Sequence, residues 1–389
     1  MFPTQFTSTS FTWERKKLGD VAEKVIQKNN NNAFKNVLTN SAEYGIISQR
    51  DFFERNIANK NNISTYYIVQ NDDFVYNPRI SNLAPYGPIN RNKTGYTGII
   101  SPLYYVFRVL NISTAFIEWY FKTTCWHKFM YQHGDSGARS DRFSIKDNEL
   151  KKLPADDMEQ EKIAKTLTSL DNTLQLHEDH LQFLHSFKSF LLQKMFFDND
   201  IPPLLRFNKF TEKWNQCRLN DHTIVTMGQS PNSKNYTNNQ TGKILVQGNA
   251  DLYKNKVLKR VFTTEVTKTA VKNDILISVR APVGDIARNQ YESVVIGRGI
   301  ASIKGNDFLY YQLEKMKNNG FWNKYIAGST FESITGKDLK NTKIYTTISD
   351  EERKIGNIFS SLTKIIQLQE HKIDSLKKLK QFLLQNMFI

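Results

Sequence analysis

The heptapeptide Phe190-Leu191-Leu192-Gln193-Lys194-Met195-Phe196 returns near the end of the chain as Phe382-Leu383-Leu384-Gln385-Asn386-Met387-Phe388. Both copies close longer matching segments, because residues 159–196 align without a gap with residues 351–388. The copies lie much further apart than the roughly 20 to 50 residues of a solenoid repeat. The sequence therefore predicts a duplicated unit, composed of a globular domain and a helix, and an internal pseudo-two-fold relation between the halves.

The repeated segment has the apolar spacing of a coiled-coil helix, with steps that alternate between four and three residues. We expect helices at about 158–197 and 350–388, each roughly 57 Å long at 1.5 Å per residue. Two seam positions are polar in both copies, His177/Gln369 and Lys188/Lys380, and polar seam residues can fix register. The apolar seam positions are Ile163, Leu167, Leu170, Leu174, Leu181, Leu184, Leu191 and Met195, and Ile355, Phe359, Leu362, Ile366, Ile373, Leu376, Leu383 and Met387.

The order of the segments predicts that the two helices pair antiparallel with each other. A first domain leads into the first helix, a second domain begins at the far end of that helix, and the second helix must then return. The alternative is that each helix packs separately on its own domain. We place the domains at residues 1–157 and 201–347, and the helical segments with the linker at residues 158–200 and 348–389.

The segments outside the helices have the composition of mixed α+β domains. Short β-prone runs alternate with turn residues, as in Tyr66–Val69, Leu103–Phe107, Asp274–Ser278 and Val294–Ile296. Each segment also has a helix-like stretch late on, near residues 114–131 and 308–325. The predicted fold is thus α+β, with two α/β-mixed domains separated by two long helices that form an antiparallel coiled coil.

Charge indicates the class of partner. The chain has 389 residues, a formal net charge of +15 and two cysteines, Cys125 and Cys217. A strongly basic balance favours a polyanion such as nucleic acid, although a basic protein without such a partner is the alternative. Two cysteines in different domains provide no disulfide framework, which fits a reduced cytoplasmic setting. We find no signal peptide and no apolar run of about 20 residues that could span a membrane.

Motifs for catalysis are missing from the sequence. There is no Gly-x4-Gly-Lys-Ser/Thr loop for a nucleotide phosphate. Asn77-Pro78-Arg79-Ile80 resembles the Asn-Pro-Pro-Tyr motif of adenine methyltransferases only weakly, because the second Pro and the aromatic are absent. The histidines at positions 177, 180 and 185 do not share one helix face, so we predict no zinc site. We predict no catalytic residue, no metal site and no cofactor bound by this chain.

A set of motifs recurs in both halves of the chain. The second domain carries Phe210-Thr211-x2-Trp214-x4-Leu219, Asp274-Ile275-Leu276-Ile277-Ser278-x5-Gly284 and Gly328-Ser329-x3-Ser333-Ile334. The first domain has matching elements in Asp73-Phe74-Val75-Tyr76 and Ser136-x7-Ser144-Ile145. The helices begin at Glu159-Gln160-Glu161 and Glu351-Glu352-Arg353 and end in the repeated heptapeptide. Taken in order, these features resemble the specificity subunits of type I restriction-modification systems over essentially the whole chain.

The resemblance implies a mechanism in which each domain is a target recognition domain for one half of a split double-stranded DNA site. The paired helices set the distance between the halves. Two methyltransferase (M) subunits supply catalysis and bind S-adenosylmethionine, and restriction (R) motor-nuclease subunits, which use ATP and Mg, can join. The alternatives are a stand-alone DNA-modifying enzyme, which would itself bind S-adenosylmethionine, and a coiled-coil adaptor whose basic charge is incidental.

Basic residues beside turn residues are the candidates for DNA contact, because loops on a rigid scaffold commonly carry readout groups. Arg79 follows a Pro after a strand-like run, and Arg280 and Arg298 stand beside Pro and Gly. The alternative for each is ordinary surface charge. The full set is Arg79, Arg91, Lys93, Arg139 and Arg142 in the first domain, and Lys234, Arg280, Arg288 and Arg298 in the second.

Polar residues that lie off the seam, yet are identical in the two helical copies, are the candidates for partner contact. Two identical partners would keep such residues alike in both halves, whereas folding alone would not. The alternative is a recent duplication that has not yet diverged. The candidate pairs are Lys162/Lys354, Glu178/Glu370 and Gln193/Gln385, and we expect the methyltransferase subunits to dock on these outer helix faces.

Overall fold

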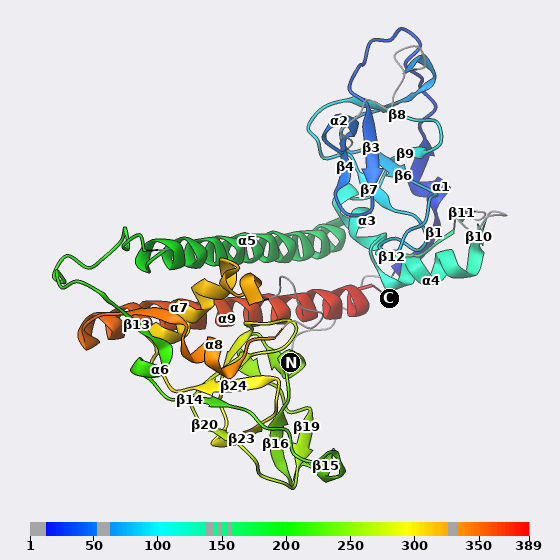
Figure 1. Cartoon of the computed structure of the whole chain (residues 1–389). Coiled ribbons are helices and arrows are strands. Elements are labelled where there is room, and N and C mark those ends of the chain that lie inside the picture. Colours follow the sequence, from blue (N-terminus) through cyan, green and yellow to red (C-terminus); the bar gives the residue numbers. More distant parts are fainter. Residues whose placement is uncertain are drawn as a thin grey trace. The chain divides into compact units, whose positions relative to one another are not determined.

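The computed structural model describes residues 13–52, 63–136, 143–145, 149–154, 157–198, 200–325 and 333–388 (Figure 1). Its contacts divide the chain into two compact units, and each is described by itself below. Unit 1 comprises residues 1–178 and 372–389, and unit 2 comprises residues 179–371. We call the part of the chain before the first long helix domain one, and the part between the two long helices domain two.

Both long helices are present. They are α5 (Asp157–Met195) and α9 (Ser349–Asn386), and each is continuous. The predicted seam is the buried stripe of each helix: Leu167 and Phe359, for example, have 0% exposure. Seam burial is what a heptad pattern predicts, because the apolar stripe needs a partner surface.

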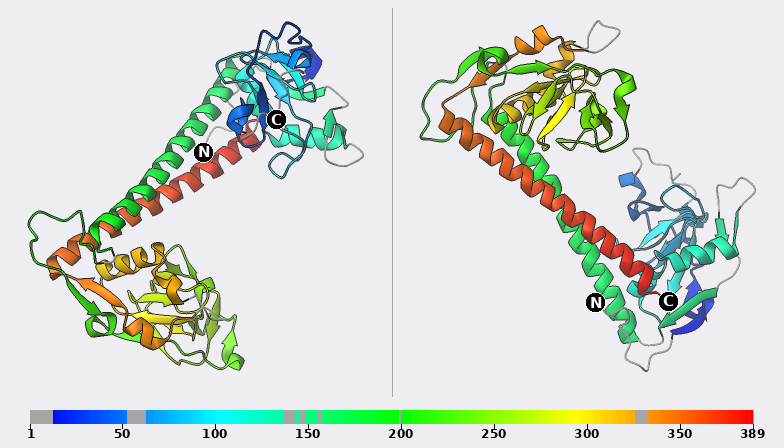
Figure 2. Two further views of the ribbon diagram at one scale, coloured as in Figure 1. Left: turned by 45° about the horizontal axis from the view of Figure 1, so that its top comes forward. Right: turned by 90° about the horizontal axis from the view of Figure 1, so that it is seen from below.

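The two helices pack against each other in opposite directions within each unit. In unit 1, Lys377 Nζ lies 2.6 Å from Glu178 Oε1 and Lys380 forms an ion pair with Asp171. In unit 2, Leu184 clusters with Leu362 and Ile366. Residue numbers rise along α5 as they fall along α9, and Figure 2 shows the two helices side by side. The predicted antiparallel coiled coil is confirmed.

Domain one is an α+β domain whose main sheet has four strands in the order β2-β9-β6-β7. Two-stranded sheets β1-β12, β3-β4, β5-β8 and β10-β11 complete it. Its elements are β1 (Trp13–Lys17), α1 (Leu18–Val21), β2 (Ala22–Lys24), β3 (Leu38–Ser41), β4 (Gly45–Ser48), α2 (Gln49–Phe52), η1 (Ile63–Thr65), β5 (Tyr67–Val69), β6 (Phe74–Tyr76), β7 (Ile89–Arg91), β8 (Gly98–Ile100), β9 (Tyr105–Val109), α3 (Thr114–Tyr120), α4 (Thr124–His133), β10 (Gly134–Ser136), β11 (Phe143–Ile145) and β12 (Glu149–Pro154).

Domain two has a six-stranded sheet, β14-β24-β21-β22-β18-β17, a five-stranded sheet, β15-β19-β16-β23-β20, and the pair β13-β25. Its elements are β13 (Asn215–Arg218), α6 (Leu219–His222), β14 (Val225–Met227), η2 (Ser233–Asn235), β15 (Tyr236–Thr237), β16 (Lys243–Val246), η3 (Asn249–Asp251), β17 (Leu252–Tyr253), β18 (Lys256–Val257), β19 (Val261–Thr263), β20 (Thr269–Val271), β21 (Ile275–Ser278), β22 (Ile286–Arg288), β23 (Ser293–Ile296), β24 (Ile300–Ile303), α7 (Asp307–Asn318), η4 (Phe321–Tyr325), α8 (Gly336–Lys340) and β25 (Lys343–Thr346).

The central strands β6 and β21 bury both of their faces and so connect two cores in each domain. Phe74 and Tyr76 contribute to a cluster with α3, α4 and the coiled-coil helices, whereas Val75 contributes to a cluster with β3, β5 and β8. In domain two, Ile275 and Ile277 face α7, and Leu276 faces the opposite core. This alternation follows from the two-residue period of a strand. The predicted β-prone runs all became strands, which confirms the mixed α+β assignment.

The predicted late helix of each domain is interrupted. In domain one, the Thr123 hydroxyl donates to the Tyr120 carbonyl oxygen (2.7 Å) and accepts from the Trp126 N–H (3.2 Å). These bonds end α3 and start α4, as a Thr at a helix N-terminus commonly does. In domain two, Gly320 adopts φ 68°, which stops α7 before the 3-10 helix η4.

The repeated heptapeptide ends each helix inside a domain core. In unit 2, Met195 and Phe196 join the core of domain two, where Phe196 has 1% exposure. In unit 1, Met387 and Phe388 join the core of domain one. Both ends therefore carry the same apolar sequence because each end fills the same kind of site.

The acidic residues at the start of each long helix form equivalent hydrogen bonds with the domain that precedes that helix. Trp13 Nε1 donates to Glu159 (3.4 Å), and Trp214 Nε1 donates to Glu351 (3.2 Å). The next position completes the match: Gln160 accepts from the backbone N–H of Ser113, the N-cap of α3 (2.9 Å). Glu352 accepts from the side chain of Asn306, the N-cap of α7 (2.7 Å). Both an amide oxygen and a carboxylate oxygen can accept this hydrogen bond, so Gln160 and Glu352 fill the same role at equivalent positions.

Candidate nucleic-acid interface

The predicted arginines after the central strands lie in corresponding loops. Arg79 follows β6 and Arg280 follows β21, and both side chains are exposed. The two strands are anchored alike at their starts, since Asp73 accepts from the Gln70 N–H (2.7 Å) and Asp274 accepts from the Val271 N–H (3.0 Å). The duplicated scaffold thus presents one arginine from each domain at the same end of its central strand.

Domain two brings a second arginine to this end of the sheet. Strands β21 and β24 pair antiparallel with Ser278 opposite Ile300. The pairing continues one step further, because the Val279 N–H donates to the Gly299 carbonyl oxygen (2.9 Å). Arg298 lies in the turn that precedes β24, closed by the hydrogen bond from the Ile300 N–H to the Gly297 carbonyl oxygen (3.0 Å), and Arg280 forms a β-bridge with Ser333, so both arginines lie at this end of the sheet without being a cross-strand pair. Arg298 is also exposed.

The loop that carries Arg298 is held close to neighbouring backbone. A Cβ atom on Gly299 would lie 2.2 Å from the Gln247 carbonyl oxygen, so this position requires glycine. On the other side of the loop, the Arg298 N–H donates to Ser230 Oγ (3.1 Å). The exposed Gln229 and the half-buried Ser230 therefore belong to the same rim. Sequence reasoning missed them, and the turn composition of Gly228–Pro231 was the available signal.

Lys234 is exposed on the short 3-10 helix η2 of the same segment. This helix is anchored by Glu265, which accepts from the Asn232 N–H (2.8 Å) and from the Asn235 side chain (2.7 Å). These hydrogen bonds lower the pKa of the Glu265 carboxyl. Lys234 thus extends from an ordered turn rather than from a sheet.

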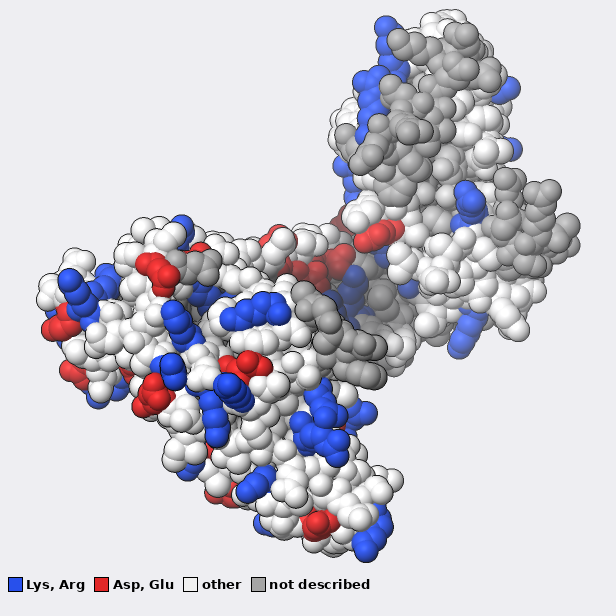
Figure 3. All heavy atoms as spheres, in the orientation of Figure 1, with Lys and Arg blue, Asp and Glu red and all other residues white. Residues whose placement is uncertain are grey.

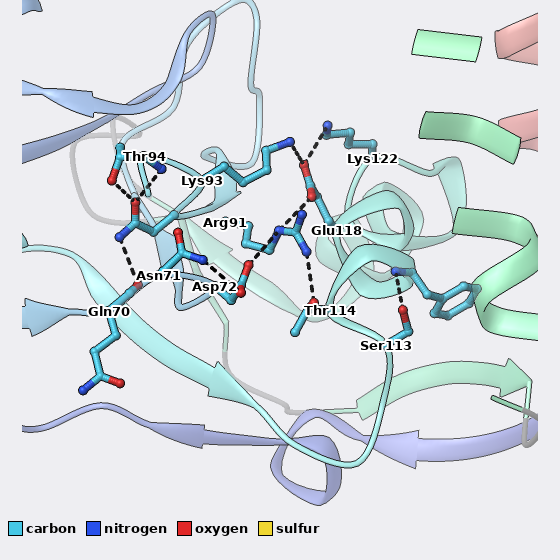
Figure 4. A network of polar contacts seen from close by, with 12 residues as sticks. Gln70, Asn71, Asp72, Arg91, Lys93, Thr94, Ser113, Thr114, Glu118 and Lys122 are labelled. Carbon is cyan, nitrogen blue, oxygen red and sulfur yellow. Dashed lines mark hydrogen bonds and ion pairs between the residues drawn. The ribbon is translucent and has the colours of Figure 1, made fainter. Parts of the chain in front are cut away.

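Two of the predicted arginines have internal partners. Arg91 Nε lies 3.1 Å from Glu118 Oε2, and Arg91 Nη1 donates to Thr114 Oγ1 (3.0 Å), so Arg91 ties β7 to α3 (Figure 4). Arg288 occupies the equivalent place on β22: it forms an ion pair with Asp307 (2.5 Å) and lies 5.0 Å from the Tyr310 ring centroid. These contacts favour a structural role for both arginines.

Lys93 shares the acidic partner of Arg91. Its Nζ lies 2.7 Å from Glu118 Oε1, and Lys122 Nζ lies 3.6 Å from the same oxygen. Burial lowers the pKa of Lys122, in spite of the opposing attraction of Glu118. Lys93 remains 57% exposed, so its ammonium lies at the outer edge of the network (Figure 4).

A pocket of about 620 Å³ opens beside Arg79 in domain one. Its walls come from β3, from the loop after β6 and from the loop before β9. Aromatic and polar side chains line it, among them Tyr66, Tyr104, Gln49 and Asn77. This mixture of apolar surface and hydrogen-bonding groups is typical of a recognition surface.

Basic side chains are spread over the face of domain two seen in Figure 3. Arg139 and Arg142 lie outside the described residues. Within the described part of the chain, no group of three or more His, Cys, Asp or Glu could hold a metal ion. Among the described helices, none is long and apolar enough to cross a membrane.

The partner-contact candidates differ in their surroundings. Lys162, Gln193 and Gln385 are exposed. Glu178 pairs with Lys377 of α9, whereas Glu370 pairs with Lys254 of domain two (3.0 Å). Lys354 is half-buried, 5.5 Å from the Phe210 ring centroid, and the neighbouring Lys209 lowers its pKa.

Exposed apolar residues repeat on the same helices. Leu176 and Leu368 occupy equivalent positions and are 68% and 60% exposed. Phe190 and Phe382 are also equivalent, at 48% and 44%. Their identity was visible in the sequence, but their exposure was not. Large apolar side chains that are exposed alike in both copies are candidates for a contact surface.

Comparisons with known proteins agree with this architecture. The family model for the type I restriction modification DNA specificity domain matches residues 11–185 and again residues 211–378. The putative type I restriction enzyme MjaX specificity subunit of Methanocaldococcus jannaschii is 30% identical over 257 residues, which are 61% of this chain and 59% of that protein. The MjaIX specificity subunit of the same organism is 27% identical over 30% of this chain and 28% of its own length. The matched part thus spans less than two thirds of these relatives.

Solved structures share the fold. The type I restriction-modification system S subunit from M. genitalium has a TM-score of 0.60 at 14% identity and covers 100% of this chain and 99% of its own. A chain from a structural study of complex assembly and conformational transition in the type I R-M system has a TM-score of 0.58 at 19% identity, with 98% of both chains covered. The names of the relatives support a specificity subunit rather than an enzyme. The chain belongs to the type I restriction-modification specificity family, with two copies of its DNA specificity domain.

Proposed function

We propose that this chain reads a two-part double-stranded DNA target, one half with residues 1–157 and the other with residues 201–347. The observation that carries the proposal is the correspondence of Arg79 and Arg280, which are exposed at the same end of equivalent strands in the two domains. Arg298 lies in the turn before β24, at the same end of the sheet as Arg280 in domain two. Arginine side chains suit both phosphate oxygens and the O6 and N7 acceptors of guanine.

The net charge of +15 supports the same partner, because neutralised phosphates dominate the affinity of most DNA-binding proteins. Within the candidate set, Arg79, Lys234, Arg280 and Arg298 are the best-supported DNA contacts. Lys93 is a secondary candidate at the edge of its network. Arg91 and Arg288 would act by holding the recognition loops in place.

The DNA proposal is tested in the assembled complex. Mapping N6-methyladenine in cells with and without this gene identifies the target, and duplexes that carry it then measure affinity. Charge reversal in R280E/R298E should weaken DNA binding. It should also reduce the steepness of the plot of log affinity against log salt concentration by about 0.9 for each phosphate contact that is lost. The control K213E/K343E makes the same change in charge at two exposed lysines of domain two that lie outside both long helices. Equal affinity for both variants would remove these arginines from the interface.

The outer faces of α5 and α9 are the proposed docking sites for two methyltransferase subunits. Leu176/Leu368 and Phe190/Phe382 supply apolar contact, and Gln193/Gln385 supply polar contact. Glu178/Glu370 lie on another side of each helix, half-buried in ion pairs with Lys377 and Lys254, so they are weaker candidates for polar contact. One partner surface fits both halves because the same side chains are exposed in both. The coiled coil would set the spacing between the two half-sites, and motor-nuclease subunits would join the resulting complex.

Docking is tested by the double substitution L176E/L368E. Two charges on a covered apolar surface should abolish assembly with the methyltransferase while the chain remains folded, since both side chains are exposed in the free chain. The control K213E/K343E alters the charge at two exposed lysines of domain two, outside both long helices. If L176E/L368E still assembles with two methyltransferases at the affinity of the wild type, the docking surface lies elsewhere.

A further inference from the structure

Lysine occupies one seam position in each unit, and both lysines lie beside a carboxylate and beside an aromatic ring of the neighbouring domain. Lys188 is 9% exposed, and its Nζ lies 2.9 Å from Glu314 of α7. The same ammonium lies 5.1 Å from the ring centroid of Tyr311, also on α7. In unit 1, Lys380 pairs with Asp171 of α5 and lies 5.1 Å from the ring centroid of Trp119 on α3.

Each aromatic residue also bonds to the second helix of its pair. Trp119 Nε1 donates to Thr168 Oγ1 of α5 (2.9 Å). The Tyr311 hydroxyl donates to Thr363 Oγ1 of α9 (3.0 Å). Thus in both units one aromatic side chain of the domain is held between the two coiled-coil helices, by a threonine from one and by a lysine from the other.

This arrangement explains why the seam tolerates lysine. An apolar residue at a seam position packs better than lysine, so two lysines at matching positions cost coiled-coil stability. Here each lysine leaves the seam and contacts the domain through a cation–π interaction, in addition to an ion pair. Domain one leads directly into α5 but is contacted by Lys380 of α9, and domain two leads directly into α9 but is contacted by Lys188 of α5. Each domain is thus held by both helices, which restrains its rotation about the helix pair.

We propose that Lys188 and Lys380, the seam lysines, are positioning residues that fix how each recognition domain is turned on the coiled coil and thereby select the spacer length of the DNA target. The inference rests on the proposed function. One added base pair turns a half-site by about 34–36° around the DNA axis, because B-DNA has 10–10.5 base pairs per turn. A domain held firmly in rotation would therefore accept one spacer length and reject its neighbours.

The test uses the full chain assembled with its methyltransferase partner. Duplexes carry the same two half-sites, separated by the natural spacer or by a spacer that is one or two base pairs longer or shorter. The measured quantity is the ratio of methylation rates on the natural and altered spacers. In K188M/K380M the ratio should fall about tenfold, which is the effect of losing roughly 1.4 kcal/mol of restraint. The arginine variant K188R/K380R keeps the charge and should retain most of the ratio.

Matched controls separate positioning from general damage. K213M/K343M removes two exposed lysines of domain two that lie outside both long helices, and it should leave the ratio unchanged. T168V/T363V removes the hydrogen bonds of the aromatic residues without changing the seam, and it should lower the ratio in the same direction. This second variant provides the readout if methionine in the seam prevents assembly.

The possible results are distinct. A folded K188M/K380M complex that is slower on every duplex, with an unchanged ratio, would overturn the inference and assign the lysines a purely structural role. An unchanged ratio in T168V/T363V would also count against it. A wild-type complex that methylates DNA without any two-part target would instead refute the proposed function itself.

Discussion

Removal of the Phe196 ring should destabilise unit 2 more than any change on the exposed face of the same helix. The side chain is 1% exposed, and its ring centroid lies 5.1 Å from that of Phe308 and 5.6 Å from that of Phe359. Transfer of a buried Phe side chain to water costs roughly 1.5–3 kcal/mol. The cavity left behind adds to this, so F196A should lose about 3–5 kcal/mol.

Urea unfolding, followed by tryptophan fluorescence and near-ultraviolet circular dichroism, measures this loss, because Trp214 lies 6.4 Å from Phe196. The control is F183A: Phe183 lies on the same helix, is 61% exposed and stacks on Phe187. It should change stability by less than about 1 kcal/mol. An F196A protein within 1 kcal/mol of the wild type would show that the helix end does not contribute to the core as its burial indicates.

Three further outcomes are expected. F388A should destabilise unit 1 by roughly 2–4 kcal/mol, because its ring stacks 5.5 Å from that of Phe116, and thermal unfolding measures it. R288M should lower the free energy of unfolding by about 1–3 kcal/mol, because it removes one partner of a half-buried ion pair. R298M should leave the free energy of unfolding unchanged and weaken DNA binding. Equal free energies of unfolding for the two variants would contradict a structural role for Arg288 and a DNA-contact role for Arg298. Burial raises the pKa of Glu351, but hydrogen bonds from Arg206, Thr347 and Trp214 outweigh this and lower it. The contribution of Glu351 to folding stability is therefore present above its unfolded pKa and is lost as the pH falls through its folded pKa. E351Q should consequently lose less stability on acidification than the wild type, as measured by urea unfolding at several pH values.

Sequence could predict the helices because a heptad seam is a local and repeated signal. The pairing direction followed from the order of the segments alone. The sequence could not separate Arg280 from Arg288, since both stand near turn residues. What distinguishes them is the partner: Asp307 meets Arg288 only after β22 and α7 have folded together. Likewise, the repeated lysine of the seam was visible, but its aromatic contact depends on how α3 and α7 pack on the helices.

The insertion of Met387 and Phe388 into the core of domain one has a consequence for synthesis on the ribosome. Unit 2 is a continuous stretch of chain, residues 179–371, and can complete its core while translation is still under way. Unit 1 also needs residues 372–389, which are made only after unit 2, although most of unit 1 is made before it. Domains commonly fold in the order of synthesis, from the N-terminus onward. Here the second domain can finish first, and a stop codon directly after residue 371 would leave the first domain with an incomplete core.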